Sequence, residues 1–96
     1  MKPFYPGIGR ESALKELNSF ITELDAGWER DGLDWAPALL TLLRAISAEA
    51  SKEAPDSQRL EDFRTEVHQY FAKHKFLKGI CFALELVDAI CGHTNT

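Results

Sequence analysis

The chain has 96 residues, of which 45% are hydrophobic and 27% are charged, and its net charge is −4. This length and composition predict one domain over residues 1–96, because such a chain can bury a core without disulfides or metals. The acidic balance argues against nucleic acid as a partner, since nucleic-acid binders carry a basic surface. A protein with a basic surface is the better match.

The N-terminal segment, residues 1–9, is expected to form an extended arm. Pro3 and Pro6 disfavour a helix, while Gly7 and Gly9 loosen the chain. The segment lacks the apolar stretch of a secretory signal, which leads us to expect a cytoplasmic protein.

The first helix is expected at about residues 10–26. Its apolar residues recur at spacings of three and four, which is typical of one buried helix face. Gly27 can end this helix, or the helix can extend to Gly32, because glycine readily follows a helix in the left-handed conformation. The apolar face consists of Leu14, Leu17, Ile21, Leu24 and Trp28.

The second helix is expected at about residues 35–53. Asp34 precedes it and can accept backbone N–H bonds as an N-cap, and Pro37 falls in the first turn, where proline is tolerated. Pro55 ends it, because the residue before proline is pushed out of the helical region.

The third helix is expected at about residues 57–74, beginning near Asp56 or Ser57. Its apolar side chains keep the helical spacing as far as His74. These side chains are Leu60, Phe63, Val67, Tyr70 and Phe71.

The fourth helix is expected at about residues 76–91, with Gly92 as the residue that follows it. It is apolar on almost every side, and Glu85 and Asp88 form one narrow polar stripe that we interpret as a solvated face. Such a helix must be covered by its neighbours, by a second copy or by a partner. The four elements and their short connections predict an all-α, compact antiparallel four-helix bundle with short loops and the N-terminal arm.

The excess apolar surface of the fourth helix suggests an alternative function as a homo-oligomeric structural or adaptor bundle. In that hypothesis a second copy packs against the outer side of this helix, making a homodimer possible. The candidate interface residues are Phe76, Ile80, Phe82 and Leu86.

Cys81 and Cys91 are expected to be free, buried thiols. On one helix their Cα atoms would lie about 15 Å apart, whereas a disulfide needs roughly 4.4–6.8 Å. Neither lies in the exposed, electropositive setting of a reactive thiol. Together with the absence of a nucleophile motif, this predicts a protein that is not an enzyme.

Metal and membrane sites are not expected either. His68 and His74 lie 240° apart around a helix, and the acidic residues between positions 23 and 34 do not have the spacing of a calcium-binding loop. No cofactor motif is present, and residues 76–91 are too few to span a bilayer.

The strongest functional candidate is the acidic segment that holds both tryptophans. Tryptophans beside carboxylates are typical of a binding hot spot for a basic protein, although both can instead close one end of the bundle. We therefore expect a small non-enzymatic interaction protein, of the inhibitor or immunity type, that binds another macromolecule. The candidate partner-binding residues are Trp28, Glu29, Asp31, Asp34 and Trp35.

The stretch from His74 to Gly79, with the sequence HKFLKG, resembles the motif around the reactive histidine of His-containing phosphotransfer domains, which are also four-helix bundles. The resemblance covers six residues, and His74 stands four positions before Lys78 where that family has three. It implies a second alternative, a phosphotransfer-like function that uses His74. The competing interpretation places His74 at the edge of the core.

Overall fold

The computed structural model describes residues 9–92, and within this range it leaves out the side chains at positions 76, 78 and 79. The expected N-terminal arm therefore lies outside the described residues, apart from Gly9, whose backbone is extended.

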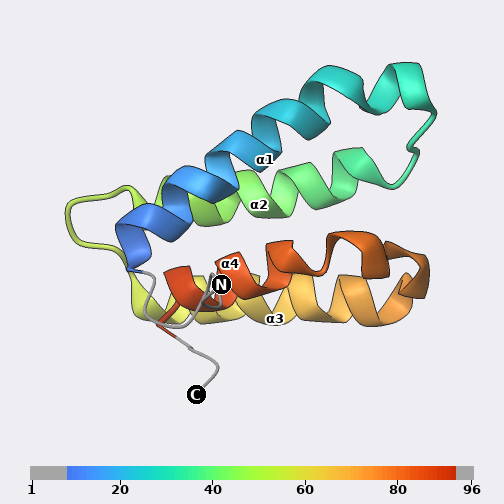
Figure 1. The fold of residues 1–96 in the computed structure, drawn as a ribbon. Helices are drawn as coiled ribbons and strands as arrows, with labels where there is room; N and C mark the ends of the chain where they lie inside the picture. The colour runs from blue at the N-terminus through green and yellow to red at the C-terminus, as the bar shows by residue number, and fades with distance from the viewer. Residues whose placement is uncertain (1–8, 93–96) are drawn as a thin grey trace, which may run out of the picture.

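The described chain folds into four α-helices and one 3-10 segment, which confirms the predicted all-α four-helix bundle. Successive helices run in opposite directions, with the α1–α2 pair lying above the α3–α4 pair (Figure 1). The elements are α1 (Arg10–Asp31), α2 (Ala36–Ala50), α3 (Ser57–Lys73), η1 (Lys75–Ile80) and α4 (Phe82–Ile90).

Helix α1 extends five residues beyond the first of its two expected ends. It stops at Gly32, the second of them. Gly32 has a φ of 68°, and its N–H donates to the Glu29 carbonyl at 3.3 Å. The Leu33 N–H donates to the Trp28 carbonyl at 2.9 Å, which completes a Schellman motif. Gly27 does not end the helix because its backbone can remain helical, whereas Gly32 supplies the positive φ that the motif requires.

The expected cap at Asp34 is wrong, whereas the third helix begins at Ser57, one of its two expected starts. Trp35 occupies the N-cap position of α2, and no side chain caps that helix. The Ala36 N–H is satisfied by the Leu33 carbonyl at 2.9 Å, so the loop backbone replaces a side-chain cap. At α3, the Asp56 carboxylate accepts hydrogen bonds from two backbone N–H groups of the first turn.

The expected fourth helix is divided in two. Residues 75–80 form a 3-10 segment, Cys81 is a turn, and regular α-helix begins only at Phe82. The sequence places a glycine, a poor helix former, at position 79. Gly92 follows α4 with a φ of 86°, as its position predicted.

The described chain covers α4 with its own helices. Helix α4 packs mainly against α1 and also against α3 and α2. The Arg10 Nε donates to the Ile90 carbonyl at 2.7 Å, which ties the start of α1 to the end of α4. Five of its residues are buried in the core: Ala83, Leu86, Val87, Ala89 and Ile90.

One buried carboxylate organises the turn between α2 and α3. Glu49, whose side chain is 4% exposed, forms ion pairs with Lys52 Nζ at 3.0 Å and Arg59 Nε at 3.2 Å. It also accepts a hydrogen bond from the Asp56 N–H at 2.9 Å. The Asp56 N–H and then the Lys52 ammonium lower the pKa of Glu49, and these effects exceed the opposing effect of burial.

Candidate protein-interaction surface

The five predicted partner-binding residues lie together at the end of α1 and in the loop that follows. We call residues 28–35 the acidic Trp loop. The side chains of Glu29, Asp31 and Asp34 are exposed, whereas Trp28 and Trp35 are half-buried and pack against the core. The tryptophans thus contribute to the end of the bundle while part of each remains at the surface.

Two sets of hydrogen bonds hold the acidic Trp loop in one conformation. The first is the Schellman motif between Trp28 and Leu33. The second is a bond from the Tyr70 hydroxyl to the Trp35 carbonyl at 2.7 Å, which ties the loop to α3. Burial raises the pKa of Tyr70, which further favours the protonated hydroxyl that donates this bond. A loop fixed in this way loses little conformational entropy on binding.

The charge of the acidic Trp loop is negative. It carries three carboxylates and one guanidinium, that of Arg30. Arg30 Nε pairs with the Asp31 carboxylate at 3.3 Å, but both side chains are more than half exposed. Such a pair contributes little and leaves the carboxylate accessible to a partner.

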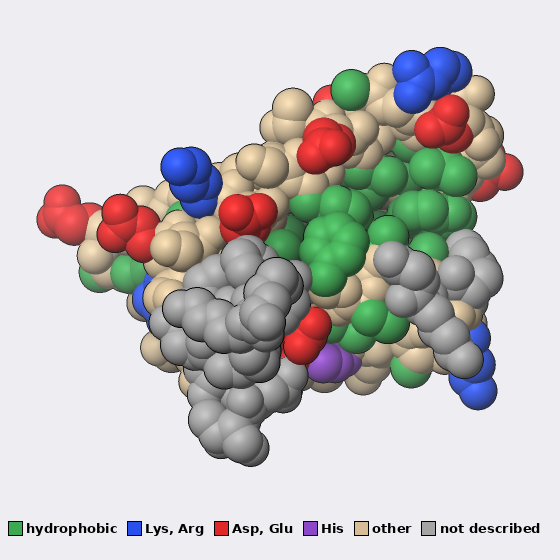
Figure 2. Space-filling view, viewed as in Figure 1, with side chains coloured by type: hydrophobic (Ala, Val, Ile, Leu, Met, Phe, Trp, Pro, Cys, Tyr) green, Lys and Arg blue, Asp and Glu red, His purple; other side chains and the backbone are tan. Residues whose placement is uncertain are grey.

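A second apolar surface, which sequence reasoning did not identify as a unit, lies between α1 and the start of α4. This α1–α4 groove has a volume of about 380 Å³ and is lined by Glu16, Ser19, Phe20, Glu23, Leu24 and Phe82. Figure 2 shows hydrophobic side chains gathered below α1, with acidic side chains along the helix above them. The only sequence signal for this groove is the spacing of positions 16, 20, 23 and 24, which places them on one side of a helix.

Phe82 is the one large hydrophobic residue that is exposed among those whose side chains the structure describes, at 38%. Its ring meets the Phe20 ring edge-to-face, with the ring centroids 5.1 Å apart and an interplanar angle of 83°. Two aromatic side chains therefore form the floor of the groove, one from α1 and one from α4. Phe20 is half-buried, and partly exposed aromatic side chains of this kind are typical of binding surfaces.

The candidate oligomer-interface residues differ in how exposed the structure leaves them. Phe82 is exposed, and Ile80 is half-buried against the core. Leu86 is 1% exposed, so it belongs to the core and cannot contact a second copy in this fold. The side chain of Phe76 lies outside the described residues.

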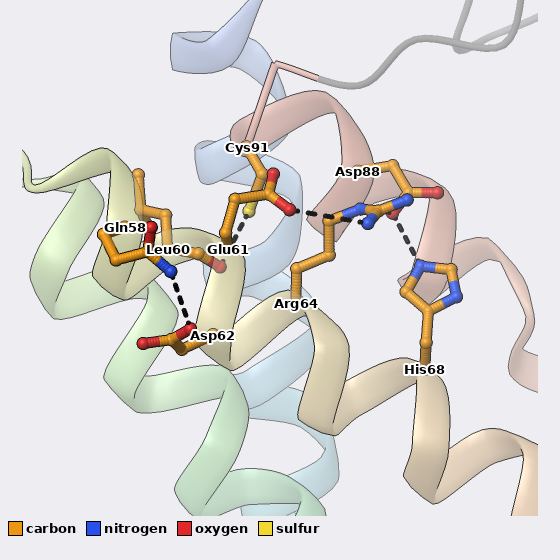
Figure 3. Close-up of polar contacts among 8 residues, drawn as sticks. All are labelled: Gln58, Leu60, Glu61, Asp62, Arg64, His68, Asp88 and Cys91. Carbon is orange, nitrogen blue, oxygen red and sulfur yellow. Dashed lines mark hydrogen bonds and ion pairs between the residues drawn. The ribbon is translucent and has the colours of Figure 1, made fainter.

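A polar cluster joins α3 to α4 (Figure 3). One oxygen of the Asp88 carboxylate accepts from Arg64 Nε at 2.9 Å and contacts His68 Nε2 at 2.7 Å. Arg64 also reaches the Glu61 carboxylate at 3.7 Å. Asp88 is only 15% exposed, so the expectation that it lies on a solvated stripe with Glu85 is wrong. The missed signal was the spacing of four between Arg64 and His68, which places both on one face of α3.

The two thiols are free, as expected, but they are not equally buried. Cys81 is exposed at the turn before α4, which corrects the prediction of a buried thiol. The break in the fourth helix at this position removes the expected burial. Cys91 is half-buried, and its thiol donates to the Leu60 carbonyl at 3.4 Å. Burial raises the pKa of Cys91 to about 11.

We expect iodoacetamide at pH 8 to modify Cys81 much faster than Cys91. A pKa of about 11 in place of 9.0 reduces the thiolate fraction of Cys91 about 100-fold. Peptide mapping by mass spectrometry over a time course would measure both rates, and in denaturant the two rates should converge. Equal rates in the folded protein would show that Cys91 is not protected.

His74 lies just after α3, half-buried, with its ring 4.4 Å from the ring of Tyr70 between centroids. This placement agrees with a histidine at the edge of the core. Within the described part of the chain, no three His, Cys, Asp or Glu side chains are grouped so that they could hold a metal ion. No helix of residues 9–92 has the length and apolar composition needed to cross a bilayer.

Comparison with known proteins finds no matching family model, curated protein or solved structure. The functional argument therefore rests on the surfaces described above.

Proposed function

We propose that the protein is a small non-enzymatic interaction module that binds a basic surface of another protein. Its most concrete form is an inhibitor or immunity-type protein, which acts by covering a functional surface of its target. The observation that supports the proposal most directly is the acidic Trp loop, which holds three exposed carboxylates and two partly exposed tryptophans on a fixed backbone. Aromatic anchors and complementary charge supply affinity and association rate in such complexes.

The proposal predicts that reversing charge in the acidic Trp loop weakens binding without unfolding the protein. Asp31→Lys combined with Asp34→Lys changes two exposed side chains. We expect at least about a tenfold loss of affinity, because attraction to a basic partner becomes repulsion. The measurement is a quantitative affinity pull-down from native lysate at several salt concentrations, with circular dichroism of each variant.

The matched control is Glu53→Lys combined with Glu66→Lys, which changes the net charge equally at exposed positions outside the loop. The control should retain the partner that the wild type captures, and binding should weaken as salt increases. If the loop variant and the control retain the same partner equally, the acidic Trp loop is not the binding surface.

A further inference from the structure

The α1–α4 groove has the features of a docking site for a helix. Its floor is the edge-to-face pair of Phe20 and Phe82, extended by Leu24 on the next turn of α1. Apolar grooves of this kind receive the apolar face of an amphipathic helix, whose anchors recur at spacings of three and four.

The charged residues that the structure places along the groove are both acidic. Glu16 and Glu23 are exposed and line the groove from the α1 side, and no cation is among the lining residues whose side chains the structure describes. These carboxylates are seven residues apart, which corresponds to two turns and about 10.5 Å along the axis. A helix lying along α1 can therefore present two cations at the same spacing.

The same charges disfavour a second copy of this chain as the occupant. Two identical grooves facing each other across a two-fold axis would bring four glutamates together. Each chain also carries a net charge of −4, so association of two copies works against electrostatic repulsion. The same negative charges repel a second copy but attract a partner with a basic surface.

We infer that the α1–α4 groove binds an amphipathic helix of the partner protein, with its apolar side chains against Phe20 and Phe82 and its lysines or arginines paired with Glu16 and Glu23. This inference rests on the proposed function and names both the partner's binding element and a surface beyond the acidic Trp loop. Phe82 supplies the apolar anchor, and the two glutamates select the sign of the partner's charge.

The test uses a helical peptide of roughly 18 residues made only of leucine and lysine, with the leucines on one face and lysines at all other positions, so that some lysines lie seven apart. Two control peptides have the same length: one scrambled so that no face is apolar, and one with glutamate in place of lysine. Titrations followed by nuclear magnetic resonance give both the affinity and the residues whose amide shifts change. We expect saturable binding of the leucine–lysine peptide alone, with the shifts concentrated at residues 16–24 and 82–86.

Two protein variants separate the apolar and the charged contributions. Phe82→Ser and the double variant Glu16→Lys, Glu23→Lys should each weaken peptide binding by about tenfold or more. Glu53→Lys with Glu66→Lys should change it by less than about threefold, because these residues do not line the groove. If Phe82→Ser does not fold, the double variant Glu16→Lys, Glu23→Lys still tests the groove.

Equal binding of the scrambled peptide, or equal affinities for the groove and control variants, would overturn the inference. It would also be overturned by a wild-type dimer in sedimentation experiments that Phe82→Arg dissociates, since a second copy would then occupy the groove. If the groove test fails while the acidic Trp loop variant still loses its cellular partner, the proposed function stands and only the docking inference is wrong. If the groove test fails and the acidic Trp loop variant also retains its cellular partner, the proposed function is wrong as well.

Discussion

Replacing Glu49 with alanine is expected to lower the Tm by about 5–10 °C at pH 7, because the α2–α3 turn loses the acceptor for three donors. The Asp56 N–H, the Lys52 ammonium and the Arg59 guanidinium would each have to find another partner. Thermal unfolding followed by circular dichroism measures the change. Glu53→Ala, at an exposed position in the same turn, is the control and should change the Tm by less than about 2 °C. Equal losses would show that Glu49 has no special role.

The same carboxylate should make stability depend on pH. Its pKa is lowered from the ordinary value of 4.5, so the folded state favours the charged form. The stabilisation is therefore fully present above the pKa of the unfolded chain and is lost as the pH falls through the lower pKa of the folded protein. The difference in Tm between the wild type and Glu49→Gln should shrink below about pH 4.5. A difference that stays constant down to pH 2.5 would contradict this linkage.

Replacing Asp88 with alanine is expected to destabilise the protein by about 2 kcal/mol, because Arg64 and His68 lose the carboxylate that they share. The loss lies below that of a fully buried ion pair, since all three side chains keep some contact with water. Urea unfolding measures the free energy. Asp62→Ala is the control, because Asp62 is exposed and accepts a hydrogen bond from the exposed Gln58 amide at 3.0 Å, and it should cost less than about 0.5 kcal/mol.

A double-mutant cycle between Arg64 and Asp88 makes the prediction sharper. The two alanine variants should couple by about 1–2 kcal/mol if the bond at 2.9 Å contributes as the geometry implies. Additive effects would instead assign the loss at Asp88 to packing of α4 against α3.

The fold could be predicted from sequence because helical spacing of apolar residues is a strong local signal. It predicted α1, α2 and α3, with α3 beginning near Asp56 or Ser57. The ends were less predictable. Whether Gly27 or Gly32 ends α1 depends on hydrogen bonds between Trp28 and Leu33 that form only once the loop closes. The division of the fourth helix at Cys81 likewise depends on how residues 75–80 pack against α3.

The candidate surface was predictable only in part. The acidic Trp loop is continuous in sequence, so its residues could be listed before the structure was known. The α1–α4 groove joins Phe20 to Phe82 across 62 positions, and no local pattern reveals that pairing. Asp88 illustrates the opposite error, because its spacing from Glu85 predicted a solvated stripe while its true partners, Arg64 and His68, lie on another helix.

The most direct test of the proposed interaction is a hydrogen–deuterium exchange footprint of the protein, alone and bound to the partner that it captures. The account predicts that binding slows exchange at residues 16–35 and at the start of α4, which together hold the acidic Trp loop and the α1–α4 groove. Residues 57–66 of α3 should exchange at the same rate in both states. Protection confined to α3, or spread evenly over the chain, would contradict the proposed binding surface.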